Sequence, residues 1–520
     1  MISAHSTEAV RAAEQPLLAA GKGPALMRAA AHGLAMGVVS LLRSHGHRIY
    51  GARVTLLVGS GNNGGDALYA GAWLASHGAR ATALLADTRT HPAALAAFEQ
   101  AGGRCLALAD DSAASIFITE AMVSHVVIDG LLGTGSRGGL RGAAAAVVAE
   151  LDGMSGAQRP LVVACDLPSG VEATTGEVHG PVLRADLTVT FGAYKSGLLS
   201  APAEQLCGKL KLIDLGISGF LGAAPVRRLE PGDCAALLPN PLAADHKYTR
   251  GVAGIIAGSA QYPGAGLLAV AAASACGPGM VRYLGPAEVA AALHLRNPEV
   301  VCSEDSPTNV RVQAWLIGPG IDGDEAQLQR AREALASARA AGIPVVVDAA
   351  GLALINPSEG GENSRLVLTP HAGELAALLT RCGRPMSRSE IEASPLAAAR
   401  AAAAFLGAVV LLKGPTTVVA NPQGSVLTQA NGNARLATAG SGDTLAGILV
   451  ALLAMDAARG STDELIVTDA LAAAVHGELS SQGSELVGES PRAPLNAGML
   501  AARIPAVWAK LSTPLPTSAS

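Results

Sequence analysis

A glycine-rich turn that ends in an aspartate is the segment of this chain best suited to chemistry. Residues 437–444 read Ala-Thr-Ala-Gly-Ser-Gly-Asp-Thr and lead into the apolar run Leu445–Leu453, which predicts a buried helix. Glycines let backbone amides close around an anion, and a helix N-terminus adds roughly half a positive charge there. The pattern therefore favours phosphoryl chemistry with Asp443 as the base. The alternative is an ordinary glycine turn in which Asp443 caps the helix.

Further polar clusters upstream of this turn each follow a predicted strand. They are Lys413-Gly414-Pro415-Thr416-Thr417 after Val409–Leu412, Thr369–Glu374 after Leu366–Leu368, Gly318-Pro319-Gly320 after Ala314–Ile317 and Gly258–Ala265 after Gly254–Ala257. The compact charge of a lysine suits a phosphate. Taken singly, each cluster is more often a turn, and His371 is more often a surface or capping residue. Because all leave a strand in the same direction, together they predict one site at one edge of a sheet.

The first half of the chain has its own glycine-rich turn. The predicted strand Val54–Val58 runs into residues 59–66, which read Gly-Ser-Gly-Asn-Asn-Gly-Gly-Asp. Its glycines expose backbone amides, and Asp66 is suited to capping the helix that follows. The alternatives are an ordinary turn and a GxGxxG site for a dinucleotide. Against the second alternative, the second and third glycines do not have the spacing that the GxGxxG motif requires.

Two more predicted strands of this half end in polar residues. One ends at Asp129 and leads into a glycine-rich run, Gly130–Gly139, and the other leads into Cys165-Asp166-Leu167-Pro168-Ser169. Three strand ends thus present the hard oxygen donors Asn63, Asp129 and Ser169. One carboxylate among neutral oxygens suits a weakly charged cation, since Ca²⁺ sites usually collect more carboxylates.

The elements that must position these residues alternate between β-type runs and alanine-rich helical stretches. The predicted strands are Val54–Val58, Ala81–Leu85, Val126–Asp129, Leu161–Cys165 and Leu187–Phe191 in the first half, and Gly254–Ala257, Ala314–Ile317, Pro344–Asp348, Leu366–Leu368 and Val409–Lys413 in the second. Such alternation predicts an α/β fold with parallel sheets covered by helices. A loop-like stretch before Pro231 divides the chain into expected domains at residues 1–222 and 232–511.

Composition excludes several classes of function. The 520 residues carry a net charge of −5 and only 3% aromatic residues, so nothing favours nucleic acid or an anionic membrane as a partner. The apolar runs that we recognise are interrupted before membrane-spanning length. Seven widely spaced cysteines without a Cys-x-x-Cys pair are typical of reduced thiols, so we expect a cytoplasmic protein.

The first half resembles the epimerase domain of the NAD(P)H-hydrate repair enzymes, a Rossmann-like domain whose signature is a Gly-Asn-Asn-Gly-Gly-Asp-Gly turn. The resemblance implies a K⁺ ion on Asn63, Asp129 and Ser169, and Asp166 as the group that moves protons. It also implies that the hydrated dinucleotide is held by Asn62, Asn63, Gly64, Gly65, Asp66, Gly133, Thr134, Gly135, Ser136, Arg137, Gly138, Gly139 and Asp166. A lysine region of the family matches Lys195, which we expect to be a neighbour of the site and not a catalyst.

The second half resembles the ribokinase-like dehydratase domain of the same enzymes over roughly residues 240–510, with the run Gly-Ser-Gly-Asp-Thr-Leu-Ala-Gly as the most specific match. The resemblance implies that Ala265, Gly320, His371 and Asp443 contact the hydrated dinucleotide, with Asp443 catalytic. It implies that Lys413, Gly414, Pro415, Thr416, Thr417 and Gly442 contact the nucleotide, ADP or ATP with Mg²⁺.

The chain departs from the family pattern at two positions. Ala67 stands where the family usually has glycine, so a methyl group there is expected to crowd the turn. Ala350 stands where the family often has the second aspartate of Asp-Ala-Asp-Ala-Leu, which removes a carboxylate that other members present.

The resemblance implies a metabolite-repair enzyme. The first domain interconverts the R and S hydrates of NADH and NADPH (NADHX and NADPHX), and the second uses a nucleotide to dehydrate the S hydrate. We expect ADP as the co-substrate, because the joined two-domain layout is typical of bacterial members, and a homo-oligomer of four or more copies. The alternative is a ribokinase-like small-molecule kinase fused to a non-catalytic ligand-binding module.

Overall fold

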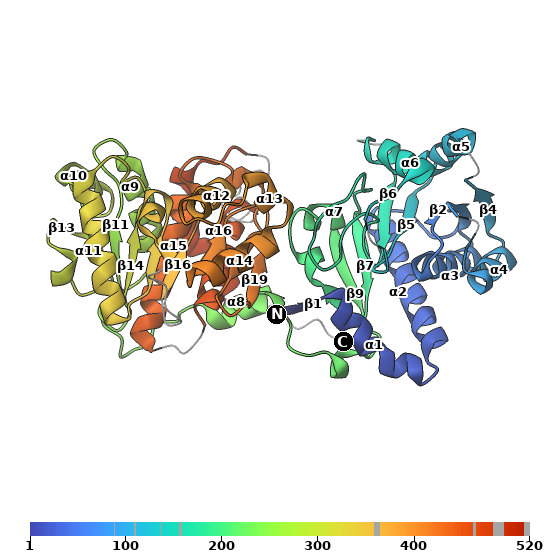
Figure 1. Ribbon diagram of the computed structural model, residues 1–520, viewed down its shortest axis with the longest axis horizontal. Coiled ribbons are helices and arrows are strands. Elements are labelled where there is room, and N and C mark those ends of the chain that lie inside the picture. Colours follow the sequence, from blue (N-terminus) through green and yellow to red (C-terminus); the bar gives the residue numbers. More distant parts are fainter. Residues whose placement is uncertain are drawn as a thin grey trace. The chain divides into compact units, whose positions relative to one another are not determined.

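The computed structural model describes residues 1–87, 89–108, 111–136, 138–154, 156, 159–357, 365–460, 464–481 and 493–513. The chain divides into two compact units. One unit is Ser3–Pro225, and the other is Val226–Ser520 together with Met1–Ile2. Each is an α/β unit built on a sheet with parallel strands, which confirms the predicted fold class (Figure 1).

The sheet of the Ser3–Pro225 unit has seven strands in the order β4-β3-β2-β5-β6-β7-β9. Every neighbouring pair is parallel. The strands are β2 (Arg53–Val58), β3 (Arg80–Leu85), β4 (Arg104–Ala107), β5 (Val126–Gly130), β6 (Leu161–Cys165), β7 (Leu187–Phe191) and β9 (Lys209–Ile213). Since all strands run the same way, their carboxyl ends share one edge, where the predicted polar clusters follow β2, β5 and β6.

Helices cover both faces of this sheet. They are α2 (Gly23–Ser44), α3 (Asn62–Ser76) and α4 (Pro92–Gln100) on one face, and α5 (Asp111–Met122) and α6 (Gly142–Asp152) on the other (Figure 1). Alternate strand residues supply the two cores: Val126 and Ile128 pack with the first group, and Val127 packs with the second. This period of two is the pattern of a sheet buried on both sides.

A short N-terminal pairing brings one further helix to the carboxyl edge of the sheet. Strand β1 (Ile2–His5) pairs in parallel with β8 (Tyr194–Lys195), with Ala4 opposite Tyr194 and His5 opposite Lys195. Helix α1 (Thr7–Ala19) follows at once, and the Ser6 side chain caps it by accepting a hydrogen bond from the Ala9 amide. Helix α1 therefore begins close to the loops that follow β7.

The sheet of the Val226–Ser520 unit is ordered β13-β12-β11-β14-β15-β16-β17-β18-β19-β10. From β13 to β17 in this order, neighbouring strands are parallel. The β17-β18-β19 segment is an antiparallel meander, and β10 pairs in parallel with β19. The strands are β10 (Val226–Arg228), β11 (Val252–Ile256), β12 (Met280–Leu284), β13 (Val301–Ser303), β14 (Ala314–Ile317), β15 (Val345–Val347), β16 (Leu366–Leu368), β17 (Val409–Leu412), β18 (Thr417–Ala420) and β19 (Val426–Gln429).

Helix α15 (Ser441–Arg459) is the central helix of this unit (Figure 1). It packs against α9 and α16, and its side chains join the main core cluster. The other helices are α8 (Pro231–Leu237), α9 (Pro263–Ala275), α10 (Ala287–Arg296), α11 (Glu325–Ala341), α12 (Ala372–Arg381), α13 (Arg388–Ala393), α14 (Pro395–Leu406), α16 (Leu465–Ser481) and α18 (Leu500–Leu511).

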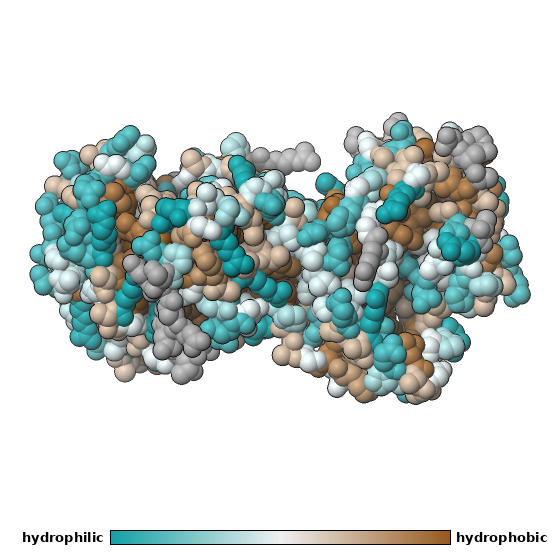
Figure 2. All heavy atoms as spheres, viewed as in Figure 1, coloured by the Kyte–Doolittle hydropathy of each residue, from teal (hydrophilic) through white to brown (hydrophobic). Residues whose placement is uncertain are grey.

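Two helices, α2 and α15, are long and apolar enough to cross a membrane by length and composition, which the sequence analysis did not recognise. In the fold, both contribute side chains to hydrophobic cores, and 72% of the apolar window of α15 is buried within the protein. Core helices and membrane spans share this composition. The face visible in Figure 2 mixes polar and apolar side chains in both units.

The close packing of α15 on α9 depends on Gly447. A methyl group added there would lie 2.3 Å from the carbonyl oxygen of Ala269. We predict that Gly447→Ala lowers the free energy of unfolding by about 1–3 kcal/mol, because the two helices must move apart. Gly264→Ala, at the start of α9, is the matched control, since a methyl group there meets no described atom within 4 Å. Denaturant unfolding of the full chain measures both, and equal midpoints for the two variants would contradict the packing account.

Candidate active sites

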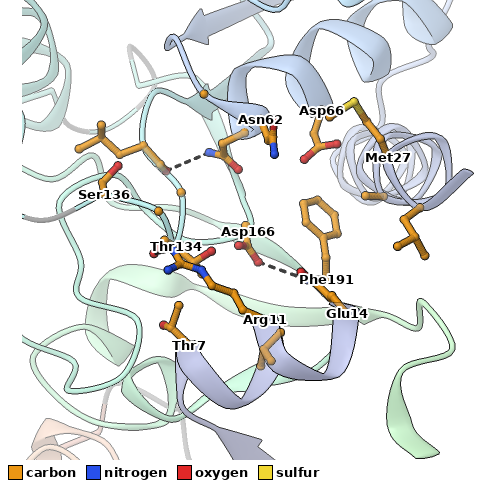
Figure 3. Close-up of a pocket in the computed structure, with 18 of the residues that line it drawn as sticks. Thr7, Arg11, Glu14, Met27, Asn62, Asp66, Thr134, Ser136, Asp166 and Phe191 are labelled. Atoms are coloured by element: carbon orange, nitrogen blue, oxygen red, sulfur yellow. Dashed lines mark hydrogen bonds between the residues drawn. The ribbon is translucent and has the colours of Figure 1, made fainter. Parts of the chain in front are cut away.

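A pocket of about 480 Å³ opens at the carboxyl edge of the sheet in the Ser3–Pro225 unit (Figure 3). Its walls come from the start of α3, the loop after β5, the ends of β6 and β7, and the helices α1 and α2. Of the predicted substrate-binding residues, it is lined by Asn62, Asn63, Asp66, Gly133, Thr134, Gly135, Ser136 and Asp166. The structure therefore gathers residues separated by about a hundred positions in the sequence around one cavity.

The predicted role of Asp66 as a helix cap is wrong. Helix α3 starts four residues earlier, at Asn62, and its N-cap is Gly61 in an extended conformation. This early start is possible because Gly64 lacks a side chain: a methyl group there would lie 2.2 Å from the carbonyl oxygen of Gly59. Asp66 consequently lies inside the helix, buried, and reaches the pocket.

The three predicted cation ligands lie together around the loop that follows β5. The fully buried Asp129 carboxylate accepts hydrogen bonds from the Ser169 hydroxyl (2.6 Å) and the Ser169 amide (2.8 Å). The Asn63 side-chain amide donates to the carbonyl of Leu132 (2.9 Å), whose own amide donates to the Ser169 hydroxyl. Burial raises the pKa of Asp129, although the Ser169 hydrogen bonds oppose that shift. One carboxylate with hydroxyl, amide and carbonyl oxygens is a donor set that fits a monovalent cation.

Asp166 and Lys195 form a buried ion pair on the floor of the pocket. The Lys195 ammonium lies 2.5 Å from Asp166 Oδ1 and also donates to the Thr190 hydroxyl (2.9 Å) and the Phe191 carbonyl (2.8 Å). Thr190 Oγ1 and the Phe191 amide donate to the same carboxylate oxygen. Asp166 itself adopts a left-handed backbone conformation, φ +66°, which is uncommon for non-glycine residues.

Helix α1 contributes pocket residues that the sequence analysis missed. Arg11 donates to the carbonyl of Thr134 (2.7 Å), so it holds the loop after β5, and Glu14 lies beside Asp166 and Lys195 (Figure 3). Burial raises the pKa of Glu14, against the opposing charge of Lys195. The sequence of α1 contains no motif, and long-range contacts bring it here: β1 pairs with β8, and Val10 and Ala13 pack against Ala193 and Ile217.

Several predicted contacts of this unit lie away from the cavity. Gly65 packs against the His91 side chain, and Gly139 packs against the backbone of His179. Gly64, Gly65, Gly138 and Gly139 do not line the pocket, and Arg137 lies outside the described residues. The buried methyl group of Ala67 faces Gly130 of β5 and does not line the cavity, so this departure from the family pattern affects the packing of α3 on the sheet.

In the second unit, the N-terminus of α15 lies next to Lys413. Gly440 caps the helix in the left-handed conformation, φ +86°, and a methyl group on Gly442 would lie 3.4 Å from the Lys413 ammonium. A phosphate at this helix start would therefore meet backbone amides and a cation together.

Two acidic side chains neutralise Lys413. Its ammonium lies 2.8 Å from Asp348 Oδ1 and 3.7 Å from Glu374 Oε2. Burial lowers the pKa of Lys413, but the charges of Asp348 and Glu374 outweigh burial and raise it overall. Asp348 was not predicted as a site residue, and Ala350 follows it in the short 3₁₀ helix η5 (Ala349–Leu354). Asp348 and Glu374 are thus the carboxylates within 4 Å of this lysine among the described residues, and the charge of Asp443 also acts on it.

Asp443, in the first turn of α15, is affected by the charges of the same three residues, Asp348, Glu374 and Lys413. Burial, reinforced by the negative charges of Asp348 and Glu374, raises the pKa of Asp443 to about 7, and Lys413 opposes the shift. A carboxyl group with a pKa near neutrality can take a proton at physiological pH and release it again, which is what a general base requires.

Buried His476 of α16 supports the same helix start. Its Nε2 lies 3.1 Å from the Ser441 hydroxyl. Burial lowers the pKa of His476 to about 4, so the imidazole is neutral at pH 7. The sequence offered no signal for this contact, because the two residues are 35 positions apart.

The remaining predicted residues of this unit are the dinucleotide contacts His371, Ala265 and Gly320 and the nucleotide contacts at residues 414–417. His371 is exposed and caps α12: its Nδ1 accepts from the amides of Gly373 and Glu374, which leaves Nε2 as the protonated nitrogen of a neutral ring. Ala265 and Gly320 lie against each other, since a methyl group on Gly320 would lie 2.6 Å from the Ala265 side chain. Gly414 and Pro415 are exposed, and Thr416, which precedes Thr417 at the start of β18, is buried.

The sequence was compared with known families and proteins. It matches the family described as NAD(P)H-hydrate dehydratase over residues 253–500 and the family described as YjeF-related protein N-terminus over residues 23–197. It is 43% identical over 454 residues to the bifunctional NAD(P)H-hydrate repair enzyme Nnr of Mycobacterium tuberculosis, covering 86% of this chain and 89% of that protein. The enzyme of the same name from Moorella thermoacetica is 33% identical over 482 residues, covering 87% of each chain.

Among solved structures, the ADP/ATP-dependent NAD(P)H-hydrate dehydratase of Bacillus subtilis, co-crystallised with ATP/Mg²⁺, matches with a TM-score of 0.47 and 28% identity. The match covers 55% of this chain and 99% of that one. The similarity to the full-length repair enzymes spans both units. The chain belongs to the family of bifunctional NAD(P)H-hydrate repair enzymes.

Proposed function

We propose that the two units of this repair enzyme divide the work between two reactions. The Ser3–Pro225 unit interconverts the R and S epimers of hydrated NADH and NADPH, and the Val226–Ser520 unit dehydrates the S epimer with ADP or ATP. The observation that carries the proposal is the position of Asp443, a carboxyl group with a pKa of about 7 at a glycine-rich helix start beside Lys413.

Dehydration then proceeds by phosphoryl transfer. Asp443 takes the proton of the ring hydroxyl as that oxygen attacks the terminal phosphorus of the nucleotide. The Gly440–Gly442 amides and Lys413 hold the phosphoryl charge. Phosphate is a better leaving group than hydroxide, so loss of phosphate and of a proton from the adjacent ring carbon restores the double bond of NADH or NADPH. Nucleotide contacts are assigned to residues 413–417 and Gly442, and dinucleotide contacts to Ala265, Gly320, His371 and Asp443.

Epimerisation is assigned to the pocket around Asp166. Its Oδ1 is fixed by Lys195, Thr190 and the Phe191 amide, and its Oδ2 has no hydrogen-bond partner in the described part of the chain. The second oxygen is therefore available for a substrate proton. The loop at residues 133–139 and the start of α3 are proposed to hold the dinucleotide.

Two cations complete the proposal. K⁺ is assigned to Asn63, Asp129 and Ser169, whose oxygens suit it, and there it would balance the Asp129 charge and tie the start of α3 to the loop after β5. Mg²⁺ is assigned to the nucleotide phosphates, whose charge it would neutralise.

We also propose a cytoplasmic homo-oligomer of four or more copies, without nucleic acid or membrane partners. The seven cysteines are free thiols, which agrees with a reducing compartment.

A ribokinase-like small-molecule kinase fused to a binding module is the second candidate. It would accumulate a stable phosphorylated product, whereas a dehydratase returns NADH. Incubation with mixed NADHX epimers and ADP or ATP, followed by cofactor absorbance and by chromatography, separates the two. The Asp166–Lys195 pair favours the repair function, because a binding module has no need of a buried acid–base group.

We predict that Asp443→Asn slows dehydration of the S epimer by about 10²–10⁴-fold, because the amide cannot accept the hydroxyl proton. Nucleotide affinity, measured by calorimetry, should change little, since Lys413 and the helix amides remain. Asp305→Asn, on an exposed residue of the same unit, is the control for the loss of one carboxylate. Near-normal turnover of Asp443→Asn would remove it from the mechanism.

The pH profile of dehydration tests the same base independently. Since Asp443 must be deprotonated to act, kcat/KM is expected to fall about tenfold per pH unit below about pH 7 and to level off above it. Asp348→Asn removes a negative charge that raises the pKa of Asp443, so the falling limb should move to lower pH. A limb that stays in place, or moves upward, would contradict the assignment.

For the other unit, we predict that Asp166→Asn reduces conversion of the R epimer to its spontaneous rate and leaves dehydration of the S epimer intact. Asp152→Asn, on an exposed residue at the end of α6, is the matched control. Each epimer is followed by chromatography with excess ADP. Unchanged consumption of the R epimer in Asp166→Asn would exclude this residue.

Replacement of K⁺ by Li⁺ should slow epimerisation and not dehydration, if Asn63, Asp129 and Ser169 hold the ion. The reason is that Li⁺ is too small to span these oxygens without moving the loop after β5. Epimerisation rates in matched KCl and LiCl buffers measure the effect. Equal rates in the two salts would show that no K⁺ is needed.

A further inference from the structure

A second carboxyl group, that of Asp66, lines the epimerase pocket together with Asp166. Asp66 is 9% exposed, and its Oδ1 is buried without a hydrogen-bond partner among the residues that the structure describes. Figure 3 shows the carboxyl groups of Asp66 and Asp166 projecting into the same space, one from α3 and the other from the end of β6. An unpaired buried carboxylate is costly, so this group is suited to a proton.

The surroundings of the two groups differ in a way that suits opposite roles. Three donors converge on Asp166 Oδ1, one of them the Lys195 ammonium, and this arrangement suits an ionised carboxylate. Asp66 has no such donors, and burial together with the charges of Asp166 and Glu14 raises its pKa well above the ordinary range. Pairs of titratable groups with contrasting environments mark the acid and the base of an active site.

We propose that Asp66 is a second catalytic residue of the epimerase, acting as the acid while Asp166 acts as the base on the other face of the ring. This inference rests on the proposed epimerase function. It gives Asp66 a part in bond breaking, beyond the contact with the dinucleotide assigned above.

The reaction balances with water as the only other reactant, since one water leaves and another is consumed. Asp66 gives its proton to the ring hydroxyl, the carbon–oxygen bond breaks, and the hydroxyl leaves as water while the ring nitrogen lone pair forms a carbon–nitrogen double bond. A second water attacks the opposite face of this carbon as Asp166 takes one of its protons, and the electron pair returns to nitrogen. The product is the other epimer, with Asp66 ionised and Asp166 protonated. The reverse reaction exchanges the two roles, and proton exchange with solvent returns Asp66 and Asp166 to their starting states before the next forward turnover.

Glu14 is the other carboxyl group near Asp166, but it fits the role less well. It lies on α1, is only partly buried, and its charge is offset by Lys195 and Arg11. Asp66 is more buried and belongs to α3, which is anchored on the sheet through contacts with β2, β3 and β5. The acid is therefore assigned to Asp66, and Glu14 serves as the comparison in the test.

The test uses the full chain without nucleotide, so that only epimerisation occurs. Asp66→Asn is expected to lower kcat for conversion of R-NADHX at least about 100-fold, with KM changed less than about threefold, because the amide cannot supply the proton. Glu14→Gln is expected to lower kcat less than about tenfold. Thermal unfolding of the same samples, compared with the wild type, reports that each variant is folded, because dehydration of S-NADHX tests only the other unit.

A rise in KM at unchanged kcat would overturn the proposal, because it would make Asp66 a binding residue only. A larger loss in Glu14→Gln than in Asp66→Asn would transfer the role to Glu14. In ¹⁸O-labelled water the wild type should place solvent oxygen in the product hydroxyl, and complete retention of the original oxygen would contradict departure of the hydroxyl as water. Absence of wild-type epimerisation above the spontaneous rate would instead reject the proposed function itself.

Discussion

In each unit, a lysine forms an ion pair with an aspartate at the carboxyl edge of a parallel sheet. Lys195 pairs with Asp166 at 2.5 Å, and Lys413 pairs with Asp348 at 2.8 Å. A lone charge in either place would be expensive to bury, and the pair makes the burial tolerable. Each pair also lies near a second carboxyl group whose pKa is raised. In one unit the charge of Asp166 acts on Asp66, and in the other the charges of Asp348 and Lys413 act on Asp443.

This arrangement follows from the direction of the strands. Parallel strands deliver all their following loops to one edge, so glycine turns, acids and lysines from distant parts of the sequence meet there. Glycine is needed at positions where the backbone lies very close to another group of the protein. Gly64 lets α3 begin against the backbone of Gly59, and Gly442 lies beside the Lys413 ammonium. The sheets thus act as rigid frames on which short loops place reactive side chains.

Much of this was predictable from the sequence. Buried strands appeared as short apolar runs between helical stretches, and four predicted strands, Leu161–Cys165, Leu187–Phe191, Ala314–Ile317 and Leu366–Leu368, have the observed bounds. Strands β1, β4, β8, β9, β10, β12, β13, β18 and β19 were missed, because they are short or because polar residues, such as Arg282 of β12, interrupt their apolar runs. The glycine-rich turns indicated both sites because the residues that suggest each site are adjacent in the sequence.

The rest depended on long-range contacts that a single sequence does not reveal. Arg11 and Glu14 reach the first pocket because β1 pairs with β8 and α1 packs against Ala193 and Ile217, and His476 meets Ser441 because α16 packs on α15. Asp66 was assigned as a cap from its residue type, since aspartate is a strong N-cap. Because Gly64 packs against the backbone of Gly59, the helix starts at Asn62, and Asp66 lies inside it and lines the pocket.

The claim that two independent sites share one chain can be tested most directly by mixing two variants. Asp166→Asn should retain only the dehydratase, and Asp443→Asn should retain only the epimerase. With both NADHX epimers and ADP present, the account predicts that the mixture restores NADH from both epimers, whereas neither variant does so alone. A mixture that performs no better than the separate variants would contradict the claim.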